Sequence, residues 1–201
     1  QTADFPSLEI QALGYHVEAL GQRSYNGVAL LSRRPFAAVR RGLAGDAADE
    51  QARYIEADID GLCVASLYLP NGNPVATEKY PYKLRWMERL EAQAAALLES
   101  EQPFVLAGDY NICPTDEDVY DPVAWREDAL CRPESRARFR SLVHLGLTDA
   151  FRVYHAEPHR YSFWDYQAGR WNRDEGLRID HLLLSPQAAD RLVGADIDRG
   201  P

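Results

Sequence analysis

The sequence predicts a single α/β domain, and three consecutive segments of its 201 residues support that prediction. Residues 51–69 contain two alternating runs separated only by Asp60-Gly61, a connection typical of a β-hairpin. Residues 81–101 carry apolar side chains three and four positions apart, which predicts the longest helix. Residues 105–107 form an apolar run without charge, which predicts a short strand buried on both faces. Together these segments predict a strand–helix–strand unit, and no repeat or linker divides the chain.

Weaker patterns predict the elements on either side of this unit. They are a helix and two strands near the start, one or two short helices in the middle, and two strands and a helix near the end. In order, they cover residues 1–12, 15–20, 28–31, 121–140, 161–166, 177–184 and 186–192, with a break expected at 133–135.

The composition is that of a globular protein, with 46% hydrophobic residues and no apolar run near the ~20 residues of a membrane span. The formal charge of −9 argues against a protein that coats nucleic acid through bulk attraction. It does not exclude a nuclease whose basic groups gather on one face. The three cysteines, Cys63, Cys113 and Cys131, match no zinc-ligand spacing, so we expect reduced thiols in a cytoplasmic protein.

Directly after the apolar strand comes an acid, Asp109. An unpaired carboxylate costs several kcal/mol to bury, so we expect Asp109 at the open end of the strand. Gly108 before it leaves room for a close approach by a backbone or a ligand. If the chain stays extended, Asp109 and Asn111 point the same way with Cα atoms about 6.6 Å apart, which suits Mg²⁺. The alternative is a loop, because Asp and Asn after a strand are also common turn formers.

Polar clusters stand at three boundaries of the apolar strands: Tyr68 with Asn71, Asp109 with Asn111, and Asp180. In sheets that are covered by helices, ligands gather at such strand ends. Two carboxylates, amides and a phenol, without a Ser-His or Cys-His nucleophile pattern, suit metal-assisted attack of water on a phosphodiester. The sequence therefore predicts a phosphoryl site where these strands end.

Four segments together resemble the successive signatures of exodeoxyribonuclease III, within the endonuclease/exonuclease/phosphatase superfamily. They are residues 68–72 (YLPNG), 108–111 (GDYN), 162–166 (SFWDY) and 176–180 (GLRID). The resemblance implies an α/β fold of four layers, in which two packed mixed β-sheets are flanked by helices. It also implies a DNA-repair hydrolase, a nuclease that acts on abasic sites and 3′ ends of duplex DNA with Mg²⁺ or Mn²⁺.

The resemblance also implies roles for individual residues around the scissile phosphate. Asp109 matches the acid that activates the attacking water, and Asn111 matches the amide that helps to hold the phosphate and the metal ion. Both are therefore the expected metal ligands. Tyr68 matches the phenol at the phosphate, and Asn71 matches a nearby substrate contact.

Other residues match the surroundings of the reacting group. Asp180 matches an acid that orients a histidine, and Trp164 matches the aromatic wall of the abasic-sugar pocket. Arg178 and the polar loop at 167–176 are candidate contacts to DNA phosphates.

Three features near these motifs are expected to be structural. His181 follows Asp180, but strand alternation turns it to the opposite face of the sheet. Trp171 is expected to pack within the protein. The acidic run at 116–118 is expected to be a solvated helix start.

The sequence departs from the family pattern at both of its ends. The family places a metal-binding glutamate before the point at which this sequence starts and a Ser-Asp-His segment after the point at which it ends. We therefore expect residues 1–201 to form one domain that lacks the family's N-terminal strands and C-terminal strand. The catalysis of such a chain is expected to be weak or absent, with few ligands for the metal and exposed sheet edges.

The expected partner is double-stranded DNA with abasic sites or 3′ blocks. We expect the protein to act as a monomer and not to associate with a membrane. Two other functions stay open. One is a superfamily phosphatase that acts on small phosphate esters such as phosphoinositides, and the other is a DNA-binding remnant without catalysis.

Overall fold

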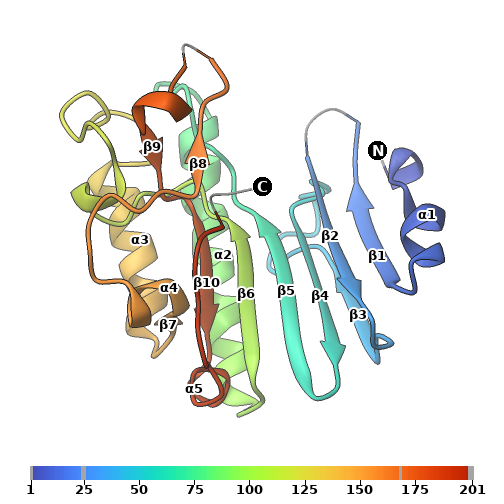
Figure 1. Ribbon diagram of the computed structural model, residues 1–201. Helices are drawn as coiled ribbons and strands as arrows, with labels where there is room; N and C mark the ends of the chain where they lie inside the picture. The colour runs from blue at the N-terminus through green and yellow to red at the C-terminus, as the bar shows by residue number, and fades with distance from the viewer. Residues whose placement is uncertain (1, 24–25, 168, 199–201) are drawn as a thin grey trace.

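The computed structural model describes residues 2–23, 26–167 and 169–198, and its centre is a six-stranded mixed sheet (Figure 1). The strand order is β3-β4-β5-β6-β10-β7. β5 and β6 run parallel, and the other neighbouring pairs are antiparallel. In sheet order the strands span Ala38–Arg41, Tyr54–Ile59, Leu62–Tyr68, Phe104–Asp109, Asp180–Leu184 and Thr148–Asp149.

The predicted strand–helix–strand unit is present at the centre of this sheet. β4 and β5 form the hairpin, and its two turn residues, Asp60 and Gly61, have φ of 49° and 78°. Such positive φ values are those of the tight turns that match the twist of paired strands. Helix α2 (Lys79–Glu99) then crosses from β5 to β6, as a parallel pair requires.

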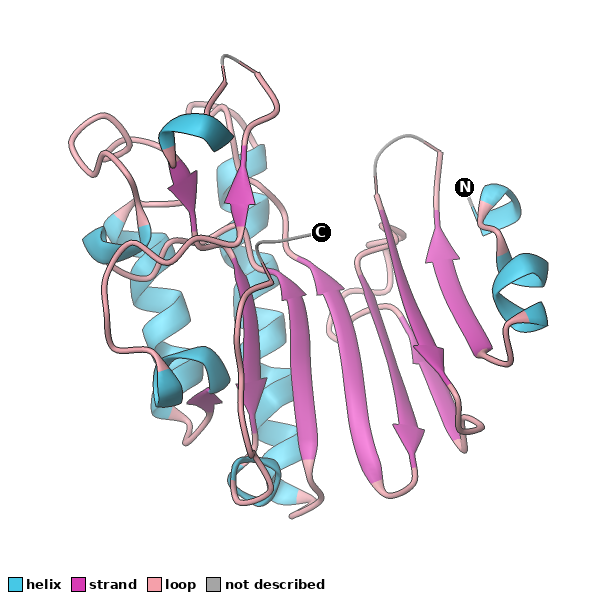
Figure 2. Ribbon diagram, viewed as in Figure 1, coloured by secondary structure: helices cyan, strands magenta, loops and turns pink. Residues whose placement is uncertain are grey.

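Two helices cover one face of the sheet (Figure 2). The apolar stripe of α2 includes Met87 and Leu90, which belong to one buried cluster with Leu106 of β6. Helix α3 (Pro133–His144) contributes Phe139 to the same cluster. Pro133 occupies the first turn of α3, where the missing N–H costs no hydrogen bond. The segment predicted as a break therefore begins a helix.

A second, two-stranded sheet covers part of the opposite face. It consists of β1 (His16–Gly21) and β2 (Gly27–Ser32), which pair antiparallel. Val28 and Leu30 of β2 pack in one cluster with Ile55 and Ala57 of β4. Helix α1 (Ser7–Ala12) lies against the far side of β1 (Figure 1). The layers are thus helices, large sheet, small sheet and helix, which confirms the expected four-layer α/β fold.

The C-terminal third carries shorter elements than the sequence predicts. The aromatic strand predicted at 161–166 is limited to β8 (Phe163–Trp164), which pairs with β9 (Gly176–Leu177). The strand predicted at 177–184 divides into β9 and β10. The remaining elements are α4 (Ala150–Tyr154), α5 (Pro186–Ala189) and single 3₁₀ turns at Thr2–Asp4, Asp116–Asp118 and Trp171–Arg173. None of the helices in the described ranges has the length and apolar character needed to cross a bilayer.

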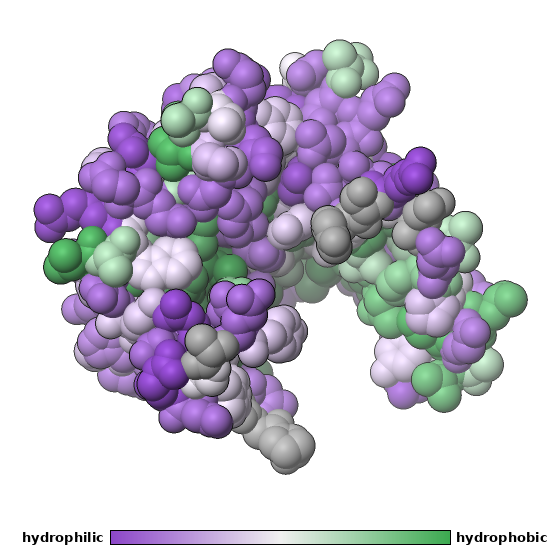
Figure 3. All heavy atoms as spheres, turned by 90° about the horizontal axis from the view of Figure 1, so that it is seen from above, coloured by the Kyte–Doolittle hydropathy of each residue, from purple (hydrophilic) through white to green (hydrophobic). Residues whose placement is uncertain are grey.

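β6 is buried on one face only, which corrects the prediction of burial on both. Phe104 and Leu106 point into the helix-covered core, whereas Val105 and Ala107 are half-buried. On the neighbouring β10, Leu182 is 45% exposed. The surface is hollowed between the region of α1 and β1 and the rest of the molecule (Figure 3). Within the described residues, the small sheet covers β4 and β5 more fully than β6 and β10, so this part of the sheet is open.

Candidate active site

Three predicted site residues meet at the same end of the central sheet. In the register of β5 and β6, Tyr68 lies opposite Asp109, and in that of β6 and β10, Asp109 lies opposite Asp180. Neighbouring strands are about 4.8 Å apart and directly paired residues point to the same face. The register thus brings a phenol and two carboxylates, from segments far apart in the sequence, into one row.

Gly108 makes this close pairing possible. Its φ is 148°, and a Cβ at this position would lie 1.9 Å from the carbonyl oxygen of Leu67 on β5. The close approach expected at Gly108 is therefore that of a neighbouring backbone. Any side chain here would push β6 away from β5 and separate Tyr68 from Asp109.

The chain does not stay extended after Asp109, which corrects the geometry expected for Asn111. Asn111 has φ of 48°, in the left-handed region that Asn tolerates better than most residues. Its backbone N–H donates to Oδ1 of Asp109 at 2.7 Å, and its Nδ2 donates to Oδ2 at 3.2 Å and to the carbonyl oxygen of Leu69 at 2.9 Å. The tip of β6 is thus a turn that the Asp109 carboxylate stabilises, as the loop alternative foresaw.

Asn71 joins this turn from the loop that follows the neighbouring strand β5. Its Nδ2 donates to Oδ1 of Asn111 at 2.9 Å. Asn111 is only 4% exposed, whereas Asn71 is exposed at the surface. The buried amide therefore fixes the exposed one, and the two predicted amides act as a unit that links the loops after β5 and β6.

The surroundings of the Asp109 carboxylate disfavour its ionised form. Burial is the largest cause that raises the pKa of Asp109 to about 7, and the nearby charge of Asp180 raises it further. The hydrogen bond from the Asn111 N–H and the charges of Lys83 and Arg53 act in the opposite direction. At neutral pH, Asp109 is thus poised between its protonated and ionised forms.

Asp180 is anchored through a hydroxyl group. Ser162 Oγ donates to Oδ2 of Asp180 at 2.7 Å, which favours the ionised form, while partial desolvation raises the pKa of Asp180. His181 points to the opposite face, so it is not a histidine that Asp180 orients. His181 is buried, with Nε2 2.9 Å from the carbonyl oxygen of Ile112, which agrees with its expected structural role.

Two basic residues beside the site were not found from the sequence. Lys83 of α2 is fully buried, and desolvation lowers the pKa of its amine to about 7. The signal for it was a lysine within the apolar stripe of a helix. Arg53 lies with its guanidinium 5.0 Å from the centre of the Tyr68 ring and donates to the Tyr68 carbonyl oxygen at 3.2 Å. Nothing in the local sequence marks Arg53, because its partner is provided by the next strand.

Arg178, a predicted phosphate contact, is instead part of the protein core. It is 1% exposed and forms ion pairs with Asp118 at 2.7 Å and Asp149 at 2.9 Å. Its NH1 also lies 3.0 Å from Nδ1 of His181. A guanidinium enclosed in this way cannot reach a DNA backbone. Asp118 is itself 0% exposed and also pairs with Arg152, so the prediction of a solvated helix start at 116–118 is wrong for Asp118. Asp116 and Glu117 are exposed in the 3₁₀ turn, as expected.

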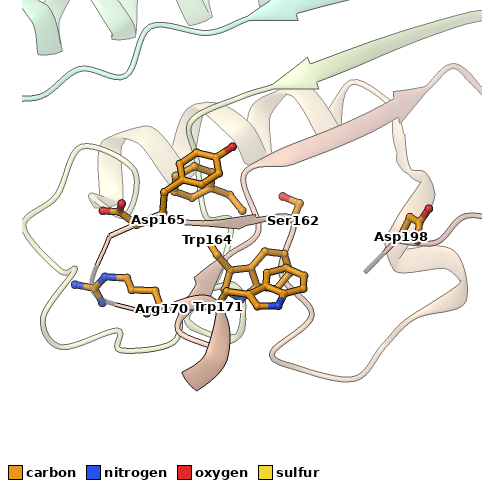
Figure 4. A pocket seen from close by; sticks show the side chains of 9 residues that line it. Ser162, Trp164, Asp165, Arg170, Trp171 and Asp198 are labelled. Carbon is orange, nitrogen blue, oxygen red and sulfur yellow. The ribbon is translucent and has the colours of Figure 1, made fainter. Parts of the chain in front are cut away.

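An aromatic pocket of about 490 Å³ adjoins the row of strand ends (Figure 4). Trp164, Trp171 and Arg170 line it, and the two indole rings meet edge to face with their centres 4.5 Å apart. Trp171, predicted as a packing residue, is thus 50% exposed at this pocket. Ser162 connects the two regions, because it lines the pocket and bonds to Asp180.

The oxygen-bearing side chains at the strand ends are of the types that bind a hard cation, but they are few. The described residues contain no group of three or more His, Cys, Asp or Glu side chains that could hold a metal ion. Mg²⁺, however, requires only one or two carboxylates, with water and phosphate oxygens as its other ligands. Asp109 and Asp180 supply two carboxylates, and desolvation is the largest cause that raises the pKa of each. Asn111 offers an amide oxygen that already accepts one hydrogen bond.

Comparison with known proteins agrees with the fold. The family model described as "Endonuclease/Exonuclease/phosphatase family" matches residues 2–201. Exodeoxyribonuclease III of Haemophilus influenzae is 34% identical over 96% of this chain and 77% of its own length.

Solved structures give the same result. The 3′ phosphatase NExo from Neisseria, bound to a product DNA hairpin, matches with a TM-score of 0.91 and 37% identity, over 94% of this chain and 74% of the other. An AP endonuclease from Archaeoglobus fulgidus matches with a TM-score of 0.88 and 33% identity, over 94% and 73%. This chain therefore belongs to the endonuclease/exonuclease/phosphatase family and is a nuclease-type hydrolase similar to exodeoxyribonuclease III.

Proposed function

We propose that this chain hydrolyses phosphodiesters of duplex DNA at abasic sites and at 3′ ends, in a reaction that depends on Mg²⁺ or Mn²⁺. The observation that carries the proposal is the row of Tyr68, Asp109 and Asp180 across three neighbouring strands. A phosphate at these strand ends would meet a phenol and two acids at once. The similarity to proteins named exodeoxyribonuclease III, 3′ phosphatase and AP endonuclease supports DNA as the substrate.

Asp109 is the proposed proton acceptor for the attacking water. A general base works best when its pKa is near the operating pH, and the pKa of Asp109 is raised to about 7. The Asn111 bonds to both carboxylate oxygens hold Asp109 in one orientation. Tyr68 and Asn71, on the adjacent strand and its loop, are the proposed contacts to the phosphate oxygens.

A metal ion would be held by Asp109, Asn111 and Asp180, and its charge would stabilise the phosphate as negative charge develops there. Two carboxylates and one amide are few ligands, and charge count and ligand number set the affinity for such ions. We therefore propose that the affinity for the metal is low and that turnover by residues 1–201 is weak.

The aromatic pocket is the proposed site for the sugar of the abasic nucleotide. A flipped sugar without a base is small and costs little to extrude. Trp164 and Trp171 offer apolar walls beside Ser162, and Ser162 leads directly to Asp180. A negatively charged protein can bind DNA here through local contacts, and Arg53, whose guanidinium lies 5.0 Å from the centre of the Tyr68 ring, is a half-buried cation beside the row.

The test is a nicking assay on a duplex with one abasic site, with Mg²⁺, Mn²⁺ or EDTA. We expect slow incision that EDTA abolishes, that rises with metal concentration into the millimolar range, and that Asp109→Asn reduces by about 100-fold or more. A parallel panel of a 3′-phosphate duplex and inositol phosphates ranks the substrates. Cleavage of inositol phosphates alone would instead establish the small-ester phosphatase.

Binding of the abasic duplex distinguishes the remaining possibility. Binding that neither EDTA nor Asp109→Ala alters, without incision under any condition, would establish a non-catalytic DNA-binding protein.

We also propose that the protein is a monomer in the cytoplasm. The three described cysteines are buried free thiols, as is usual in a reducing compartment, and size-exclusion chromatography with light scattering tests the oligomeric state.

A further inference from the structure

Lys83 is the single buried cation that joins the two loops of the candidate active site in the described part of the chain. It projects from α2 with 0% exposure, and its Nζ donates to the carbonyl oxygen of Asn111 at 2.6 Å and to that of Asn71 at 3.1 Å. These are the two residues whose side chains bond to each other at 2.9 Å. The loops after β5 and β6 are thus tied together through their side chains and, separately, through their carbonyl groups.

The surroundings of Lys83 are built to accommodate it. A Cβ at Gly72, where φ is 91°, would lie 2.7 Å from Cδ of Lys83. The stem of the lysine therefore fills the space that a side chain at position 72 would take. On the other loop, Asn111 has φ of 48°, and the bond from Lys83 fixes the direction of its carbonyl group. An uncommon backbone conformation persists where its surroundings determine it.

Stability alone does not explain a buried amine at this position. Removing an amine from water is unfavourable, and even buried ion pairs can often be replaced by apolar residues without loss of stability. A methionine of similar length would fill the same space beside Gly72 without that cost. What the amine supplies and a methionine does not is a pair of directed hydrogen bonds to the two loops.

We propose that Lys83 is a positioning residue of the active site, which sets the relative placement of Asn71 and Asn111 from behind the sheet. The inference deepens the proposed function and rests on it for one of its two readouts. Through Asn111, Lys83 also acts on Asp109, because the N–H and Nδ2 of Asn111 bond to the carboxylate of Asp109. Lys83 itself touches no substrate.

The test compares Lys83→Met with Lys79→Met. These are the only two lysines of the chain, and both belong to α2, but Lys79 is exposed and Lys83 is buried. The first readout is steady-state kinetics on the abasic duplex. We expect Lys83→Met to reduce kcat about 10- to 100-fold with KM within about 3-fold, because a misplaced group costs transition-state stabilisation. Lys79→Met is expected to leave both unchanged.

The second readout needs no activity. Hydrogen–deuterium exchange in Lys83→Met is expected to speed up at least 10-fold for residues 69–73 and 110–113, with β10 unchanged. Unaltered exchange in both loops, or an unaltered kcat in a folded Lys83→Met protein, would overturn the inference. If the wild-type protein cleaves no DNA, the proposed function fails, while the exchange experiment still decides the role of Lys83.

A second variant covers the case in which Lys83→Met does not fold. Gly72→Ala keeps the lysine but places a methyl group against its stem, and no atom of residues 110–113 is among the closest neighbours of that methyl group. We expect faster exchange at 110–113 in this variant, transmitted through Lys83. Exchange that changes only around residue 72 would count against the inference.

Discussion

Asp109 and Asp180 are directly paired across β6 and β10, and this register places two carboxylates next to each other at the end of the central sheet. Like charges at this distance oppose each other's ionisation. The pKa of Asp109 is raised to about 7, and Asp180 contributes to that shift after burial. The pair gives the site both a proton acceptor near neutrality and a demand for a cation.

Replacing Asp180 by Asn is expected to lower the pKa of Asp109. The substitution removes a negative charge that raises this pKa but leaves the burial of Asp109 in place, so the value should fall without returning to that of a free carboxyl. A titration of ¹³C-labelled carboxyl groups by NMR, in metal-free buffer, measures it directly. The exposed Asp190, beyond α5, provides the control as Asp190→Asn. An unchanged or higher pKa of Asp109 in Asp180→Asn would contradict the interpretation of the pair.

Replacing Gly108 by Ala is expected to destabilise the protein by about 3 kcal/mol or more, because the methyl group would meet the Leu67 carbonyl oxygen at 1.9 Å. Gly146 is the matched control. Its φ is also positive, at 109°, but a Cβ there meets nothing within 4 Å among the described residues. Gly146→Ala should therefore cost only about 1 kcal/mol of backbone strain. Urea unfolding of both variants makes the comparison, and equal costs would rule out the close approach of β5 as the reason for Gly108.

Replacing Arg178 by Met is expected to reduce the free energy of unfolding by about 3–5 kcal/mol, because it leaves Asp149 without its cation and Asp118 with Arg152 alone. It should not alter the salt dependence of DNA binding. A residue that contacts a phosphate contributes about 0.9 to the slope of log K against log salt. Fluorescence anisotropy of an abasic duplex at several salt concentrations measures that slope. A reduced slope in Arg178→Met would restore Arg178 as a phosphate contact.

His181 is expected to make the protein less stable as the pH falls from about 6.5 to about 4. Burial, with a further contribution from the charge of Arg178, lowers its pKa from 6.5 to about 4. Between these values the unfolded chain binds a proton that the folded protein does not, so the stabilisation is complete above pH 6.5 and is lost below it. Over that range the loss is about 3 kcal/mol.

The measurement for His181 is urea unfolding of the wild type and of His181→Gln at several pH values. Asp109, with its raised pKa, contributes with the opposite sign in nearly the same range, so the difference between the two proteins isolates the histidine. The exposed His144 serves as the control, as His144→Gln. Parallel stability curves for the wild type and His181→Gln would show that the imidazole does not titrate in this way.

Local patterns predicted the parts of the fold that local chemistry decides. The turn at Asp60 and Gly61, the helix between β5 and β6, and the strand before Asp109 follow from side-chain periodicity and backbone preference within a few residues. The same local reasoning predicted one continuous strand at 177–184, where the structure has β9 and β10. The break between β9 and β10 depends on the pairing of β9 with β8 and on the burial of Arg178.

The sequence identified most of the polar residues of the site, but not the contacts that they make with one another. Motif and strand boundary together named Tyr68, Asp109 and Asp180, and the register shows them in one row. The loop alternative anticipated a turn after Asp109, but the sequence did not indicate that Asn111 bonds to both carboxylate oxygens of Asp109, or that Arg178 pairs with two acids from other elements. Each of these outcomes depends on a partner that a distant segment supplies.

The sequence by itself determined the α/β class, the strand–helix–strand centre and the family resemblance, because these depend on spacing and residue type along the chain. Only the tertiary structure decided which charges are buried. Arg178 looks like a surface residue in the sequence, and Lys83 differs from one only by its place in an apolar stripe. Both are enclosed because carbonyl oxygens or carboxylates from other elements replace their water. The free energy of a buried charge depends on what surrounds it in three dimensions, and this is information that neighbouring residues in the chain do not carry.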